Sequence, residues 1–173
     1  KVFIGCGAGF SGDRFDAAVP VVDTLAKRNG ARFLIFEVLA ERTLATAQRL
    51  RITDADAGYS PYLDYYIEPI LKKTKENQIR IVSNLGAANP VSAANRIYTI
   101  AKKLGIKDVK IAVVLGDDLL GVYSADELRK LPTMEGISVG DRDIIAANVY
   151  LGARPIAEAL ALDVDVVLVG RST

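Results

Sequence analysis

Residues 109–115 are apolar at nearly every position, and this segment constrains the fold more than any other stretch of the chain. A strand that is hydrophobic on both faces is typical of a parallel sheet covered by helices on both sides. Four more short apolar runs have the length of buried strands, at residues 2–4, 33–38, 79–82 and 164–169. The chain therefore predicts five strands, each buried in one sheet.

Helical patterns occupy the segments between these runs. We expect helices at residues 17–29, 40–50, 91–104, 125–130 and 153–162, and an irregular helical segment at residues 58–77 that Pro69 splits. This alternation predicts an α/β fold with a predominantly parallel sheet of about five strands flanked by helices, Rossmann-like. Part of a β/α barrel is the alternative, because both folds gather their loops at one edge of the strands.

Length and charge limit the functional classes. The 173 residues fit a single α/β domain, residues 1–173, and we expect it to be the N-terminal part of a longer protein because the chain stops in a turn after the fifth strand. The net charge of +1, without runs of like charge, argues against nucleic-acid and membrane partners. No apolar run could span a bilayer and no signal peptide precedes the first strand, so we expect a cytoplasmic protein.

The counts of cysteine and histidine limit the catalytic mechanisms that this chain could use. The single cysteine, Cys6, excludes an intrachain disulfide, which also favours the cytoplasm. Histidine is absent, so Ser-His-Asp and Cys-His nucleophile systems and histidine-containing zinc sites cannot be built from this chain. Any proton transfer would depend on carboxylates, lysine, tyrosine or a bound cofactor. A nucleophilic role for Cys6 is the less favoured reading, since a lone cysteine at a strand end is more often a small buried side chain.

The turn at residues 83–89 is the first candidate ligand site. It joins a predicted strand to a helix that Asn89 caps and Pro90 begins, and it consists of small residues. Free N–H groups and the helix dipole favour an anion there, such as a phosphate or carboxylate. A tight strand-to-helix connection without a ligand is an equally weighted alternative. The candidate contacts of this turn are Ser83, Asn84, Gly86 and Asn89.

A glycine-rich loop follows the first strand. Gly7, Gly9 and Gly12 have the spacing of a dinucleotide fingerprint, and Glu37 could bind a ribose. However, Pro20 is tolerated only near a helix start, which makes the loop too long for the standard fingerprint. We therefore favour a general ligand-binding loop over an NAD site. Its other candidate contacts are Ser11, Asp13 and Arg14.

Acidic residues lie at the ends of two of the predicted strands. Glu37, Asp117 and Asp118 should all lie at the carboxyl edge of a parallel sheet. A buried Glu37 would have a raised pKa and could act as an acid or base, or it could pair with Arg42. The two aspartates could bind hydroxyl groups or, less favoured, a divalent cation, and we assign no metal ligand.

Two segments suit a partner chain. Four of the seven tyrosines lie in residues 59–66, and clustered aromatics at helical spacing more often form packing or a subunit interface than a substrate wall. The long irregular connection at residues 120–152 is typical of a lid or an interface element. A homo-oligomer is therefore an expectation.

Several long motifs run through nearly the whole chain in a fixed order: IGCGAGFSGDRFDAA, FEVLAERTLATAQ, GYSPYL, IRIVSNLGAANP, GDDL, NVYLGARPIAEALA and VVLVGR. In these motifs the chain closely resembles the N-terminal region of the acyclic terpene utilisation AtuA-like family, formerly a domain of unknown function. The resemblance implies bacterial catabolism of acyclic terpenes such as citronellol and geraniol, whose later intermediates are coenzyme A thioesters. It supplies no catalytic residues. The family glycine is present as Gly170 with Arg171, but Ser172-Thr173 departs from the usual valine-alanine-aspartate continuation.

Three functional hypotheses follow. The first is a cytoplasmic enzyme acting on a branched acyl or acyl-coenzyme A intermediate, with Glu37 as acid or base and Arg14 and Arg171 as counter-charges. The second is an NAD(P)-dependent oxidoreductase that uses the glycine loop, and NAD is the less favoured ligand. The third is a non-catalytic ligand-binding or assembly subunit.

Overall fold

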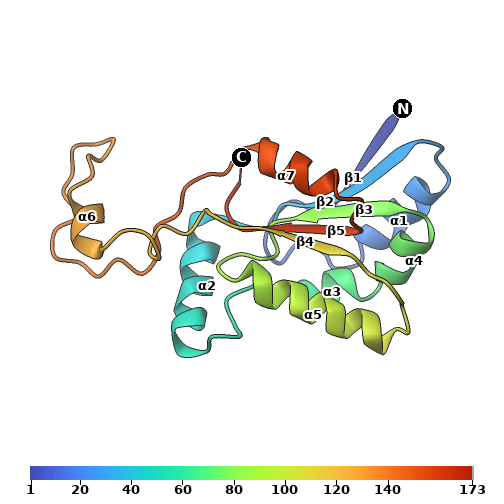
Figure 1. Cartoon of the computed structure of the whole chain (residues 1–173), viewed down its shortest axis with the longest axis horizontal. Helices are drawn as coiled ribbons and strands as arrows, with labels where there is room; N and C mark the ends of the chain where they lie inside the picture. The colour runs from blue at the N-terminus through green and yellow to red at the C-terminus, as the bar shows by residue number, and fades with distance from the viewer. Residues whose placement is uncertain (173) are drawn as a thin grey trace.

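The computed structural model describes residues 1–172, and it shows a five-stranded sheet in the order β1-β2-β3-β5-β4 (Figure 1). The strands are β1 (Val2–Ala8), β2 (Ala31–Phe36), β3 (Ile79–Ser83), β4 (Ile111–Val114) and β5 (Val166–Val169). Every neighbouring pair is parallel. The predicted α/β fold with a parallel sheet of five strands is therefore confirmed, and this sheet is not closed into a barrel.

The helices cover the two faces of the sheet unequally. They are α1 (Ala18–Ala26), α2 (Glu41–Thr53), α3 (Leu63–Ile67), α4 (Leu71–Glu76), α5 (Pro90–Lys103), α6 (Ala125–Arg129) and α7 (Ala153–Leu160). On one face lie α1, α3, α4 and α5, whereas α7 lies on the other face, over β4 and β5 (Figure 1). No helix in residues 1–172 is both long and apolar enough to cross a bilayer.

Local sequence explains where the best-defined helix begins. The side chain of Asn89 accepts a hydrogen bond from the N–H of Ser92 at 3.2 Å, and Pro90 occupies the first turn of α5. Gly86 lies so close to Pro90 that an added Cβ would be 2.7 Å from the proline ring. The small-residue turn between β3 and α5 is thus required by packing.

The main core lies between the sheet and the helices of the more covered face. Its largest fully buried side chains include Phe36 of β2, Tyr66 of α3 and Ile97 of α5. Tyr66 also donates a hydrogen bond to the carbonyl oxygen of Asp13, at 2.9 Å. The tyrosine segment is therefore partly a core element, and Pro69 separates α3 from α4 as expected.

Candidate functional site

The carboxyl ends of all five strands meet at one edge of the sheet, which brings the predicted turns together. Along this edge the order is the glycine loop after β1, Glu37 after β2, the turn after β3, Arg171 after β5 and Asp117 after β4. The last predicted turn includes Thr173, which lies outside the described residues. In parallel α/β sheets this edge is where ligands bind.

The turn after β3 is a buried connection whose N–H groups are largely in use. Every residue from Ser83 to Pro90 is buried. Within this turn, the N–H groups of Leu85, Ala87 and Asn89 donate to acceptors of the turn itself, and that of Ala88 donates to the Gly58 carbonyl. The structure therefore favours the alternative of a tight connection for most of this turn. Asn89 caps α5 and donates to the carbonyls of Ala55 and Ala57, both at 2.8 Å.

Asn84 connects this turn to the end of β2. Its side-chain oxygen accepts the N–H of Val38 at 2.8 Å, and its amide donates to Oε1 of Glu37 at 2.9 Å. Glu37 itself is exposed, so the expectation of a buried carboxylate at this position is wrong. The side chain continues the alternation of β2 toward solvent, and the Asn84 amide fixes one of its oxygens.

A cavity of about 270 Å³ lies beside Asn84, and we call it the first cavity. Its apolar wall includes Val38, Leu39, Ala47 and Leu50. The polar groups that line it are Ser11, Arg42, Thr43, Thr46, Ser60, Tyr62 and Asn84. The mixture of an apolar wall and a few hydroxyl and amide groups is typical of a small-molecule site.

A second, smaller cavity of about 200 Å³ lies further along the same edge. It is bordered by Asp117, Asp118 and Asn148 on the β4 side and by Arg51 and the first residues of α5 on the other. The connections on its two sides leave the sheet in opposite directions, because α5 follows β3 on one face and α7 follows β4 on the other (Figure 1). Such a switch in direction is a preferred ligand position in α/β sheets.

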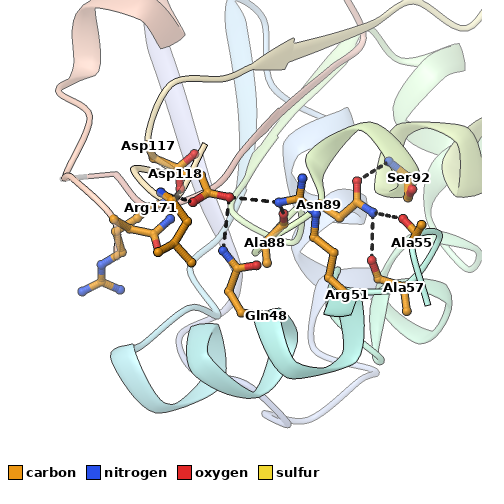
Figure 2. Close-up of polar contacts among 12 residues, drawn as sticks. Gln48, Arg51, Ala55, Ala57, Ala88, Asn89, Ser92, Asp117, Asp118 and Arg171 are labelled. Carbon is orange, nitrogen blue, oxygen red and sulfur yellow. Dashed lines mark hydrogen bonds and ion pairs between the residues drawn. The ribbon is translucent and has the colours of Figure 1, made fainter. Parts of the chain in front are cut away.

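The two aspartates after β4 make different contacts (Figure 2). Asp117 is 4% exposed, and its Oδ2 accepts the N–H of Arg171 at 2.7 Å and the amide of Asn148 at 3.0 Å. Asp118 is partly exposed and pairs with Arg51 of α2 at 3.0 Å, with Gln48 donating at 3.3 Å. Asp117 thus joins the ends of β4 and β5, and Asp118 joins β4 to α2.

The sequence of this chain matches one known protein family along nearly its whole length. The family model described as acyclic terpene utilisation family protein AtuA matches residues 2–173. The chain belongs to this family. A search of curated proteins and a search of solved structures each found no match.

In this family member the glycine loop is built around Asp13. Its carboxylate accepts the N–H of Gly9 at 3.1 Å and that of Arg14 at 2.8 Å, which closes the loop on itself. Gly7 lies within β1 against Phe36, and Gly12 has a φ of +85° that favours glycine. Among the loop residues that the structure describes, Ser11 lines the first cavity.

The two predicted counter-charges lie in different surroundings. The Arg14 guanidinium pairs with Asp16 in solvent, and its hydrogen bonds lower the pKa of that carboxyl. The Arg171 guanidinium donates to the Leu39 carbonyl, pairs with Glu41 at 2.7 Å and lies 4.2 Å from the centre of the Tyr150 ring. The hydrogen bond from the Tyr150 hydroxyl is the main cause of a lowered pKa of Glu41, and a backbone hydrogen bond and then the charge of Arg171 lower it further. Arg171 therefore fixes the start of α2 to the end of β5.

Helix α2 forms part of the wall of the first cavity, which the sequence did not predict. The helix begins almost directly after β2, so its first turns lie over the carboxyl edge of the sheet. Thr43, Thr46, Ala47 and Leu50 follow the i, i+3, i+4, i+7 spacing of one helix face, and all four line the first cavity. That spacing was the signal available in the sequence.

Other chemistry-bearing side chains lie outside the two cavities. Cys6 is exposed on β1, and its Sγ donates to the Ala8 carbonyl at 3.4 Å. Within residues 1–172, no three cysteine, aspartate or glutamate side chains gather closely enough to hold a metal ion. A wide groove of about 1220 Å³ runs beside the tyrosine segment, where Arg96 holds Asp64 by a two-pronged ion pair.

Proposed function

We propose that this protein is a cytoplasmic enzyme of acyclic terpene catabolism that acts on a branched acyl group or its coenzyme A thioester. The first cavity is the observation that carries the proposal, because it combines an apolar wall with a short row of hydroxyl groups at the ligand-binding edge of the sheet. A branched hydrocarbon chain gains stability from such a wall in proportion to the apolar surface that it buries.

The charged part of the ligand binds at the rim of this cavity. Arg42 lines the cavity and belongs to the exposed first turn of α2. A guanidinium donates paired hydrogen bonds to a carboxylate or phosphate, which suits both a free acid and the anionic groups of coenzyme A. The cavity volume of about 270 Å³ accommodates the acyl portion, so the nucleotide part of a thioester extends outside it.

Glu37 is the acid or base in this proposal. Glu37 lies outside the cavity lining, but its Oε1 accepts a hydrogen bond from the amide of Asn84, which does line the cavity, so Asn84 connects the carboxylate to the ligand site. Proton transfer by a positioned carboxylate is an established mode of catalysis, and the chain has no histidine for the task. Asp118 is positioned to accept a hydroxyl of a ligand that reaches the second cavity.

The oxidoreductase alternative is less well supported by the arrangement of strands. In dinucleotide-binding folds the glycine-rich turn follows a central strand and leads straight into a helix. Here β1 lies at the edge of the sheet, and nine residues separate Ala8 from the start of α1. The Asp13 carboxylate already uses two loop N–H groups that a pyrophosphate would need.

A thermal-shift titration with a branched acyl-coenzyme A ester, the free branched acid, coenzyme A and NAD tests the proposal. A ligand present at about 100 times its dissociation constant should stabilise the fold by about 2.7 kcal/mol, which raises the melting temperature by about 5–10 °C in a chain of this size. We expect this shift with the acyl ester, and a smaller one with the free acid.

A matched pair of variants locates the binding site. Ala47→Phe places a ring in the first cavity and should abolish the shift, whereas Ala45→Phe, on the same helix but outside the cavity lining, should retain it. Glu37→Gln should keep the binding shift and lose turnover. A shift with NAD alone, or an acyl shift that survives Ala47→Phe, would contradict the proposal.

A further inference from the structure

One face of β1 and β2 has no covering layer among the described residues. Val2 and Ile4 are 63% and 65% exposed, and Ile35 is 39% exposed. The register places Ile4 beside Phe33 and Cys6 beside Ile35, so these side chains form one apolar surface, which we call the open face. Helix α7 covers the same side of the sheet only over β4 and β5 (Figure 1). Parallel sheets are normally covered on both sides, so the open face is incomplete.

Residues 121–146 form an arm that extends away from the rest of the chain (Figure 1). Four large apolar side chains of this arm are more than half exposed: Val122 at 71%, Leu131 at 57%, Met134 at 106% and Ile137 at 64%. Three of them, Leu131, Met134 and Ile137, lie within seven positions of the sequence, and exposed apolar side chains that form one patch often mark an interaction site.

Hydrogen bonds hold the arm in one conformation, both within it and where it joins the rest of the chain, so little further ordering is needed when it binds a partner. Ser124 and Glu127 form a capping box at the start of α6, and Arg129 donates to the Arg142 carbonyl at 3.0 Å across the arm. At the base, the N–H of Leu119 donates to Ala147 and that of Val149 donates to Asp117, both at 2.8 Å. These bonds hold the arm pointing outward from the carboxyl edge of β4.

The arm and the rest of the chain carry opposite charge. Residues 121–146 contain five acidic and three basic side chains, a net charge of −2. The whole chain has a net charge of +1, so the remaining residues carry +3. An arm is therefore attracted to the body of another copy at long range, and this attraction weakens with salt.

We propose that the arm of one copy covers the open face of a second copy, in a twofold dimer in which both arms are exchanged. A single interface then buries the apolar residues of the arm and those of the open face. Because a twofold axis makes the contact twice, each contact needs to bury only about half of the 1,200–2,000 Å² typical of stable interfaces. The proposal is independent of the acyl ligand.

Chemical cross-linking provides the decisive test, because Cys6 is the only cysteine and lies on the open face. In Met134→Cys protein, a short bis-maleimide should link position 134 of one copy to Cys6 of the other, and the joined peptides identify the pair. The control is Ile52→Cys, at a 69% exposed position on α2 outside both surfaces, which should give no such product. Equal cross-linking in both variants, or a Cys6-to-Cys6 link in the unchanged protein, would overturn the proposal.

Two further measurements use proteins whose folding can be verified by their melting curves. Light scattering on the unchanged chain should show a dimer, and Met134→Asp should raise its dissociation constant at least about tenfold. The alkylation rate of Cys6 in the unchanged chain should fall as protein concentration rises. A monomeric mass with a concentration-independent alkylation rate would show that the open face is not covered by a second copy.

Discussion

Glu37 and Asp117 both follow a strand at the same edge of the sheet, yet their surroundings differ. Asp117 is 4% exposed and accepts the N–H of Arg171 and the amide of Asn148. Glu37 is exposed, and the structure gives its carboxylate one side-chain donor, Asn84. The neighbouring strand accounts for the difference, because β5 inserts between β3 and β4 and places its backbone against Asp117.

The comparison separates a structural carboxylate from one that is available for chemistry. Asp117 satisfies two donors that would otherwise lose their acceptor, so its role is to join β4, β5 and the base of the arm. Changing Glu37 removes the acceptor of one side-chain amide, that of Asn84, and leaves no backbone N–H without its acceptor. An acidic residue at a strand end is thus a candidate for catalysis only when no neighbouring backbone requires it.

The largest expected effect is on stability, from Asp117→Ala. This change should lower the free energy of unfolding by about 3 kcal/mol, because two hydrogen-bond donors lose a charged acceptor in a buried position. Glu37→Ala should change it by less than about 0.5 kcal/mol, as is usual for an exposed side chain. Urea denaturation of both variants measures the two values. Equal losses would remove the distinction between the two carboxylates.

Gly170 offers a second way to test the fixed carboxylate. A Cβ at this position would lie 2.3 Å from Oδ2 of Asp117, so Gly170→Ala must displace the carboxylate from the Arg171 N–H. We expect a loss of about 2 kcal/mol. Gly9→Ala is the control, since its Cβ would meet nothing within 4 Å.

A double-mutant cycle shows whether the two losses share a cause. In an Asp117→Ala background, Gly170→Ala should lower stability by less than about 0.5 kcal/mol, because the clashing atoms are gone, which gives a coupling energy of at least about 1 kcal/mol. Additive losses would mean that Gly170 is required for some other reason.

Much of the fold was predictable because it depends on local patterns. The apolar run at residues 109–115 indicated a sheet covered on both sides, and Asn89 with Pro90 located the start of α5. The first strand was underestimated: β1 continues to Ala8, because Gly7 packs against Phe36 instead of beginning a ligand loop. Strand order was not predictable, since the insertion of β5 between β3 and β4 depends on contacts distant in sequence.

The candidate site was predictable only in part, for a related reason. That the strand-end turns meet at one edge follows from parallel strands alone. Which of their polar groups remain free depends on pairings between distant segments, such as Asn84 with Val38 or Arg171 with Asp117. The cavity wall from α2 was missed because the sequence predicts a helix at residues 40–50 but not which of its faces borders a cavity, which depends on distant segments.

The carboxylate of Asp64 is intermediate in exposure between the buried Asp117 and the exposed Glu37. Its side chain is 35% exposed in the groove beside the tyrosine segment, and Arg96 donates to it through Nε at 2.9 Å and also through a terminal nitrogen. The hydrogen bonds from Arg96 are the main cause of a pKa of Asp64 below its ordinary value of 3.8, and the charge of Arg96 adds to the effect. This carboxylate is neither buried nor free, so its contribution should be small and dependent on pH.

The smallest predicted effect is therefore that of Asp64→Asn. Because the pKa of Asp64 is lowered in the folded state, the ion pair contributes stability above the unfolded-state pKa, near 4, and loses it as the pH falls through the folded-state value. At pH 7 we expect a loss of about 0.5–1 kcal/mol, the range for a solvent-screened pair. Unfolding free energies measured from pH 7 down to pH 2 should show the unchanged protein approaching the variant below pH 4. Arg96→Gln removes the pair from the other side and should show the same convergence; a difference that stays constant with pH would mean that Asp64 stabilises the groove through its shape and not through its charge.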